Sequence, residues 1–191
     1  MSAIDYRKYY HLERYLFDEV AVRYAGTQKL SAYDFFCIVI WKANRAKSKV
    51  AKRLLAKGFD DLEKAVSALT TSIAGAPDDR ARLEILVNDW GFRLPMASAI
   101  LTVLYPNSFT IYDIRVCDVL GNFRNTQYRT NFDSLWREYQ EYVAAVGKAV
   151  SENFDLRDKD RWLWGKSFHE QLKEDIDAQF KKLREETEAK A

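Results

Sequence analysis

Residues 86–101 have the residue types that can hold a phosphate group with backbone amides. A helix-forming stretch leads to Gly91, and a second stretch rich in Ala and Leu follows at residues 94–101. A glycine turn between two closely packed helices can point its N–H groups outward, and with the N-terminus of the second helix these bind an anion. Gly91 would also suit an ordinary helix end, so both interpretations stay open.

Asp113 is the second residue that could do chemistry. It lies between residues 109–112 and 114–117, two stretches in which most side chains are apolar. Asp is a favoured N-cap residue, and taken alone Asp113 is most simply the start of a helix. An N-cap carboxylate can also face a cleft, so the capping and the chemical role can coexist.

A basic run, residues 41–53, contains six Lys and Arg side chains and no acidic one. The whole chain is nearly neutral, with 30 Lys+Arg against 28 Asp+Glu, so a surface for a polyanion must come from local segregation of charge. The basic run is the best candidate for such a surface. The alternative is a solvated helix face.

Taken together, residues 86–101 and 109–116 resemble the helix-hairpin-helix DNA glycosylase superfamily. That family is marked by a Gly-x-Gly hairpin, an Ala-rich helix and an Asp-x-[His/Arg]-Val motif. Gly91 corresponds to the first hairpin glycine, and Asp113-Ile114-Arg115-Val116 matches the aspartate motif. Residues 31–55 resemble, more weakly, the long helix at the floor of the family's base pocket.

The resemblance implies a two-lobed helical fold that flips a nucleotide out of duplex DNA and hydrolyses its N-glycosidic bond. The carboxylate of Asp113 would stabilise the positive charge that develops at C1′ as the base departs. We predict DNA-backbone contacts at Gly91, Phe92, Arg93, Leu94, Met96, Ala97, Arg115, Lys47 and Lys49. We predict a base pocket formed by Trp41, Lys42, Asn44, Arg45 and Tyr112.

Three departures from the family pattern refine this expectation. Arg93 replaces the second hairpin glycine, where a left-handed backbone would be strained, although its side chain could contact a phosphate. Pro95 stands where lyase-type members carry a Schiff-base lysine, so we expect hydrolysis without lyase activity at that position. The chain lacks clustered cysteines, and His11 and His169 are isolated, so we expect no iron–sulfur cluster, metal or other cofactor.

Composition predicts an all-α fold, because 7 Gly and 3 Pro in 191 residues are too few for a protein with many strands and turns. We expect one compact unit over residues 1–191, with a hairpin lobe at 30–125 and a second lobe formed by 1–29 and 126–191. Cys37 and Cys117 suit reduced core thiols. With no signal peptide or membrane-spanning stretch in the sequence, we expect a cytoplasmic monomer, nucleoid-associated if bacterial.

The hydrophobic periodicity predicts where the helices lie. We expect them at residues 6–24, 35–58 with a kink near Asn44, 62–69, 80–88, 94–104, 113–120, 132–150 and 158–188. Two tryptophans in the last of these, Trp162 and Trp164, are expected to seal that helix against the core, with stacking on bases as the alternative.

The leading hypothesis is a monofunctional DNA glycosylase that excises a damaged or modified base from double-stranded DNA. An alkylated purine, a damaged pyrimidine or an enlarged viral base would each fit, and the role could be repair or defence against phage DNA. One alternative is a non-catalytic helix-hairpin-helix module that binds DNA. Another is a helical protein-interaction domain.

Overall fold

Helices and their connections make up the computed structural model, which describes residues 5–151 and 153–180. Within these ranges there is no strand, so the predicted all-α class is confirmed. The α-helices are α1 (Leu12–Tyr15), α2 (Ala21–Thr27), α3 (Ala32–Ala43), α4 (Lys47–Leu55), α5 (Leu62–Ala74), α6 (Asp79–Glu84), α7 (Leu94–Leu104), α8 (Ile114–Leu120), α9 (Phe132–Ala149) and α10 (Leu156–Asp177). Shorter 3₁₀ or π turns are η1 (Tyr6–Tyr9), η2 (Leu16–Val20), η3 (Asn44–Ala46), η4 (Ile85–Asp89) and η5 (Thr126–Tyr128).

Polar side chains fix the start of six of these helices. Each accepts a hydrogen bond from a backbone N–H of the first turn, which satisfies a donor that the helix leaves unpaired. The six caps are Ser31 (α3), Asp61 (α5), Asp78 (α6), Asp113 (α8), Asn131 (α9) and Asp155 (α10). The predicted capping role of Asp113 is therefore confirmed.

Several predicted helices have different bounds, and the one expected at 6–24 is divided into η1, α1, η2 and α2. The helix expected at 62–69 continues to Ala74, because the Thr70 and Ser72 hydroxyls donate to carbonyls four residues back, Val66 O at 2.8 Å and Ala68 O at 3.0 Å. Both hydroxyls therefore find hydrogen-bond acceptors within the helix, and the helix continues past them.

The long helix expected at 35–58 is broken where the kink was predicted. Ala43 has φ −161° and ψ 84°, which ends α3, and η3 reorients the chain before α4 begins. The last helix, predicted at 158–188, begins at Leu156 and ends at Asp177, and residues 181–188 of that prediction lie outside the described part of the chain.

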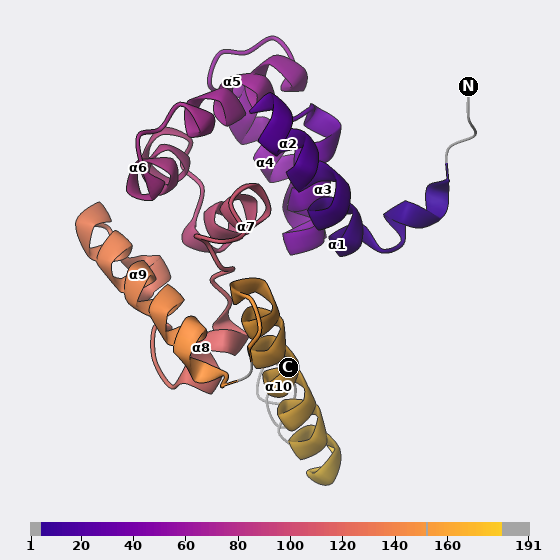
Figure 1. The fold of residues 1–191 in the computed structure, drawn as a ribbon, viewed down its shortest axis with the longest axis vertical. Helices are drawn as coiled ribbons and strands as arrows, with labels where there is room; N and C mark the ends of the chain where they lie inside the picture. Colours follow the sequence, from indigo (N-terminus) through magenta and orange to yellow (C-terminus); the bar gives the residue numbers. More distant parts are fainter. Residues whose placement is uncertain (1–4, 152, 181–191) are drawn as a thin grey trace, which may run out of the picture.

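Helix α7 lies among the other helices in Figure 1, and nine of its eleven residues are buried. Helices α2, α3 and α6 pack on α7, whereas α8 packs on α9 and α10. Helix α1 packs on α3, so contacts between helices cross the predicted boundary between the two lobes. Cys37 and Cys117 are buried free thiols, as predicted.

Residues 109–113 form the last part of the connection from α7 to α8, and we call them the approach segment; residues 109–112 are buried. The Tyr139 hydroxyl donates to Thr110 O at 2.7 Å, and the Tyr142 hydroxyl donates to Ile111 O at 2.7 Å. Burial raises the pKa of both tyrosines, so their hydroxyls stay protonated and able to donate. Tyr112 N donates in turn to Ser98 Oγ of α7 at 2.9 Å. Side chains of α7 and α9 thus form the hydrogen bonds that the backbone of this segment would otherwise form within a helix or a sheet.

Replacing Tyr142 with Phe is expected to destabilise the fold by about 1–2 kcal/mol, because the buried Ile111 carbonyl loses its donor. Urea unfolding followed by circular dichroism measures the change. Tyr128→Phe, at a tyrosine that is 66% exposed, is the matched control and should have no effect. Equal stability of the two variants would contradict the clamping role of the Tyr142 hydroxyl.

Candidate active site

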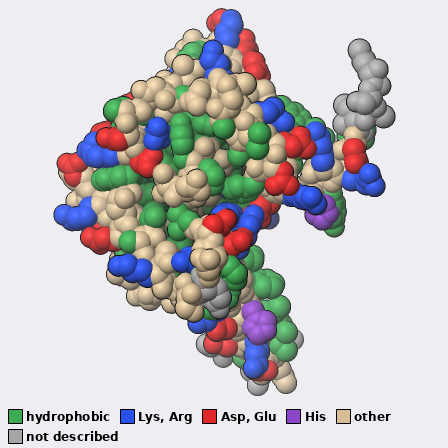
Figure 2. Space-filling model, in the orientation of Figure 1, with side chains coloured by type: hydrophobic (Ala, Val, Ile, Leu, Met, Phe, Trp, Pro, Cys, Tyr) green, Lys and Arg blue, Asp and Glu red, His purple; other side chains and the backbone are tan. Residues whose placement is uncertain are grey.

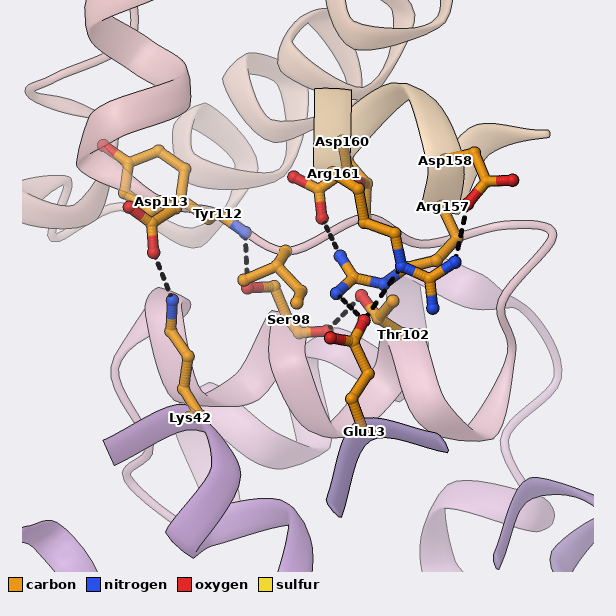
Figure 3. Close-up of polar contacts among 12 residues, drawn as sticks. Glu13, Lys42, Ser98, Thr102, Tyr112, Asp113, Arg157, Asp158, Asp160 and Arg161 are labelled. Atoms are coloured by element: carbon orange, nitrogen blue, oxygen red, sulfur yellow. Dashed lines mark hydrogen bonds and ion pairs between the residues drawn. The ribbon is translucent and has the colours of Figure 1, made fainter. Parts of the chain in front are cut away.

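Asp113 presents its carboxylate at the start of α8, where two groups hold it. Oδ1 accepts the cap hydrogen bond from Arg115 N at 3.1 Å, and Oδ2 accepts a hydrogen bond from Lys42 Nζ at 2.7 Å. Figure 3 shows Lys42 reaching from its helix toward the carboxylate. The side chains are 14% exposed for Lys42 and 23% for Asp113, so the pair is mostly shielded but still reaches solvent.

A cavity of about 560 Å³ opens beside this pair, within the range of small-molecule sites. Its walls come from α1, the end of α3, the approach segment with the start of α8, and α10. The lining residues are Glu13, Trp41, Lys42, Ile111, Asp113, Ile114, Arg115, Arg157, Asp160, Arg161 and Trp164. Aromatic rings and charged groups therefore face one space.

An ion-pair network closes one side of the cavity and joins α1 to α10 (Figure 3). The Arg157 guanidinium pairs with Glu13 and Asp160, and it lies over the Trp41 ring at 5.2 Å. Arg161 Nε adds a second contact to Glu13 at 2.9 Å. Helix α1 is thereby tied to α10, and the Trp41 wall is fixed.

Burial controls the protonation state of Asp160, the carboxyl group that pairs with Arg157 in this network. It raises the pKa of Asp160 from 3.8 to about 6, against the opposing effect of Arg157 and Lys42, and the charge of Asp113 adds to the rise. Burial acts in the same direction on Glu13, but there Arg157 and Arg161 outweigh it and lower the pKa.

The hairpin turn between α6–η4 and α7 has one left-handed residue, Gly91, with φ 67°. Arg93 has φ −75° and ψ 152°, an extended conformation that any residue adopts without strain. The strain expected at Arg93 is therefore absent, because the helix begins directly after it and no second glycine is needed. Its side chain is exposed.

The predicted hairpin contacts separate into two groups. Phe92 N donates to Leu86 O at 2.8 Å, and the amides of Met96 and Ala97 both donate to Arg93 O at 3.0 Å. These three amides are used by the fold. Among the described residues, no partner accepts from the amides of Gly91, Arg93 and Leu94, which remain the candidates for an anion. The Phe92 and Leu94 side chains are buried and cannot reach a ligand.

The basic run reaches both the hairpin turn and Asp113. The Arg53 side chain lies beside the turn. Its Nε is 3.9 Å from the position that a Cβ would take at Gly91, and its guanidinium is 5.4 Å from the centre of the Phe92 ring. Lys42, near the other end of the run, holds Asp113.

Lys47 and Lys49 are exposed on α4, the helix that carries Arg53. On the face drawn in Figure 2, Lys and Arg side chains are interspersed with Asp and Glu. The exposed lysines of α4 are therefore a local basic feature of that helix, as the composition implies.

The predicted base pocket is only partly assembled. Trp41 and Lys42 line the cavity, but Asn44 and Arg45 are exposed in η3 and do not. Tyr112 is buried, and its hydroxyl donates to Phe123 O at 2.6 Å, away from the cavity. We correct its placement: Ile111 and Asp113 line the cavity, and the residue between them faces the other way.

Arg115, predicted to contact the DNA backbone, also lines the cavity. Its guanidinium donates to Gln171 Oε1 at 2.7 Å and lies 5.6 Å from the centre of the Trp164 ring. Trp162 and Trp164 do not seal α10 against the core, since they are 41% and 43% exposed and the buried residue between them is Leu163. Trp164 instead forms part of the cavity wall.

The network residues of α10 were not predicted from the sequence. Arg157 and Asp160 lie one turn apart, which could have suggested an i,i+3 ion pair. Nothing in their spacing indicates that Glu13, 144 residues away, completes it.

Comparison with models of known protein families gives no match, and curated proteins and solved structures give no significant match. No helix in the described part is long and apolar enough to cross a bilayer. The described residues also hold no cluster of three His, Cys, Asp or Glu side chains suited to a metal.

The raised pKa of Asp160 predicts that stability increases as the pH falls from 7 to 5. The folded protein keeps a proton on Asp160 below about pH 6, where the unfolded chain has lost it, so the free energy of unfolding should gain about 1 kcal/mol over this window. Asp160→Asn removes the titration and should flatten the gain. Urea unfolding at both pH values measures it, with Asp158→Asn, on the same turn of α10, as the control. A gain that persists in Asp160→Asn would contradict the assignment.

Proposed function

We propose that this protein is a monofunctional DNA glycosylase that hydrolyses the N-glycosidic bond of a flipped-out base and leaves an abasic site. The observation that carries the proposal is the Asp113 carboxylate, held at a helix start and open to an aromatic-walled cavity. The residues that resemble the helix-hairpin-helix DNA glycosylases support it, since Asp113 lies in their aspartate motif.

The chemistry needs negative charge where positive charge develops. As the base departs, the sugar acquires oxocarbenium character at C1′, and a carboxylate in a poorly hydrated cavity stabilises that charge more strongly than one in bulk water. The Arg115 amide and Lys42 hold both carboxylate oxygens in place before substrate arrives. The same carboxylate would orient the attacking water.

The proposed DNA contact is the hairpin turn together with α4. The free amides of Gly91, Arg93 and Leu94 would donate hydrogen bonds to a backbone phosphate, and Arg53 beside Gly91 would add a positive charge. Lys47 and Lys49 would extend this contact along the strand. Because these groups bind phosphate and not base edges, they would let the protein scan duplex DNA without reading its sequence.

The base would enter between Trp41 and Trp164, whose rings line the cavity. Aromatic walls stack on any base, so an alkylated purine, a damaged pyrimidine and an enlarged viral base all stay within the proposal. We propose that the protein acts as a monomer on DNA in the cytoplasm or nucleoid, in repair or against foreign DNA.

One observation favours the alternative, a non-catalytic DNA-binding module. The Lys42 ammonium, 2.7 Å from Asp113, offsets the negative charge that the reaction would use. A module of this kind would bind duplex DNA in a salt-dependent manner and release no base.

Replacing Asp113 with Asn is expected to lower base release by about 100-fold or more, because the amide carries no charge to stabilise C1′. The measurement is mass spectrometry of free bases released from genomic DNAs of varied origin, including phage DNA with modified bases. Alkaline cleavage of modified duplexes then locates the abasic sites. Asp118→Asn, in the same helix but paired with Arg124, is the control and should release bases at the wild-type rate. Absence of released bases with the wild-type protein, alongside duplex binding, would favour the module.

Replacing Arg53 with Gln is expected to weaken binding equally for all duplex sequences. Losing one phosphate contact should reduce the slope of log K against log salt concentration by about 1. Fluorescence anisotropy at several salt concentrations gives the slope, with Arg124→Gln as the control. An unchanged slope would remove Arg53 from the proposed DNA contact.

A further inference from the structure

Helix α10 carries a row of large apolar side chains that the described part of the chain leaves exposed. Four of them are between 39% and 56% exposed: Trp164, Phe168, Leu172 and Ile176. They occur at every fourth position, so they lie along one side of the helix. In Figure 1, α10 extends beyond α8 and α9, the helices on which it packs. A contiguous exposed apolar surface of this kind indicates a binding partner.

The charged side chains of α10 are segregated along its length. Residues 161–169 contain two Lys or Arg side chains and no acidic one, whereas residues 170–177 contain four acidic side chains and one lysine. The acidic half repels DNA and anionic lipid, so the apolar row is poorly suited to either. It attracts a basic helix with apolar side chains, and the first half of α10 is itself such a helix.

The order of residues along this side of α10 is self-complementary about Phe168. Arg161 and Asp175 lie seven residues to either side of it, and Trp164 and Leu172 lie four residues to either side. These positions share one face, because steps of three and four residues follow the turn of the helix. Two antiparallel copies related by a two-fold axis at Phe168 would therefore place Arg161 beside Asp175 twice. Parallel copies would place like charges together.

Gly165 and the residues after the helix also favour a second copy. A Cβ at Gly165, on the same face, would meet no atom within 4 Å, so another helix has room to approach there. Residues 181–191 contain one large apolar side chain, Leu183, which is too few to cover the row.

We infer that two copies of this protein associate through α10 as an antiparallel pair centred on Phe168. The paired segment, residues 161–175, is about 21 Å long, so the interface is small and the association is micromolar. Because Trp164 also lines the cavity, the pair covers the wall at which a base would enter. This last consequence rests on the proposed function: the monomer proposed to act on DNA is released when the pair separates.

Sedimentation velocity of the full-length protein without DNA tests the association. We expect a monomer–dimer equilibrium in the micromolar range. Phe168→Glu should weaken it at least about 100-fold, because the two-fold axis brings the two new carboxylates together. Val22→Glu, at an exposed apolar side chain of α2, is the control and should dimerise like the wild-type protein. A wild-type protein that stays monomeric up to about 1 mM would overturn the inference.

Disulfide cross-linking tests the antiparallel register. Trp164→Cys and Leu172→Cys proteins are mixed, one of them with a tag that changes its gel mobility, and are mildly oxidised. The native Cys37 and Cys117 are buried. We expect a disulfide between the two different variants, whereas parallel helices would give disulfides within each variant. Lys166→Cys, on the opposite side of α10, is the control and should not cross-link.

Dimers that form no mixed disulfide, or that cross-link equally through position 166, would overturn the antiparallel pair. Neither experiment uses DNA, so both are independent of base release. Dimerisation without base release would count against the glycosylase alone, and base release by a protein that is monomeric at every concentration would count against the α10 pair alone.

Discussion

The site depends on satisfying the buried backbone of the approach segment, residues 109–113. A connection through the core has no neighbouring strand or helix turn to pair with its N–H and C=O groups, and an unpaired buried backbone group costs about 1–3 kcal/mol. Hydroxyls of Tyr139, Tyr142 and Ser98 supply the missing partners. These hydrogen bonds fix the backbone directly before Asp113. They therefore determine where Asp113 caps α8 and where its carboxylate points.

In the proposed function, the basic run, residues 41–53, would link DNA binding to the chemistry at Asp113. Lys42 lies at Asp113, and Arg53 lies at the Gly91 turn. The extended backbone at Ala43 and the turn η3 separate α3 from α4, and the two helices of this one stretch reach the two places. A phosphate held at the turn and a sugar at Asp113 would thus contact the two ends of the same segment.

Sequence reasoning predicted what local rules determine. Most of the helices, the cap at Asp113 and the break near Asn44 follow from periodicity and side-chain chemistry, and Trp41 and Lys42 do line the cavity. It missed what depends on contacts between residues distant in the sequence, above all the cavity wall formed by α10, which an ion pair between Arg157 and Glu13 holds in place. Tyr112 was misplaced because adjacent side chains in the approach segment face opposite sides, so the residue before Asp113 points away.

The central claim is that the Asp113 carboxylate acts on positive charge at C1′. It is tested most directly with two duplexes that carry an abasic-site analogue, one with a cationic pyrrolidine ring and one with a neutral tetrahydrofuran ring. The account predicts that the wild-type protein binds the cationic analogue at least about 100-fold more tightly and that Asp113→Asn loses this preference, since binding that resembles the transition state depends on the charge. Equal affinity of the wild-type protein for the two duplexes would contradict it.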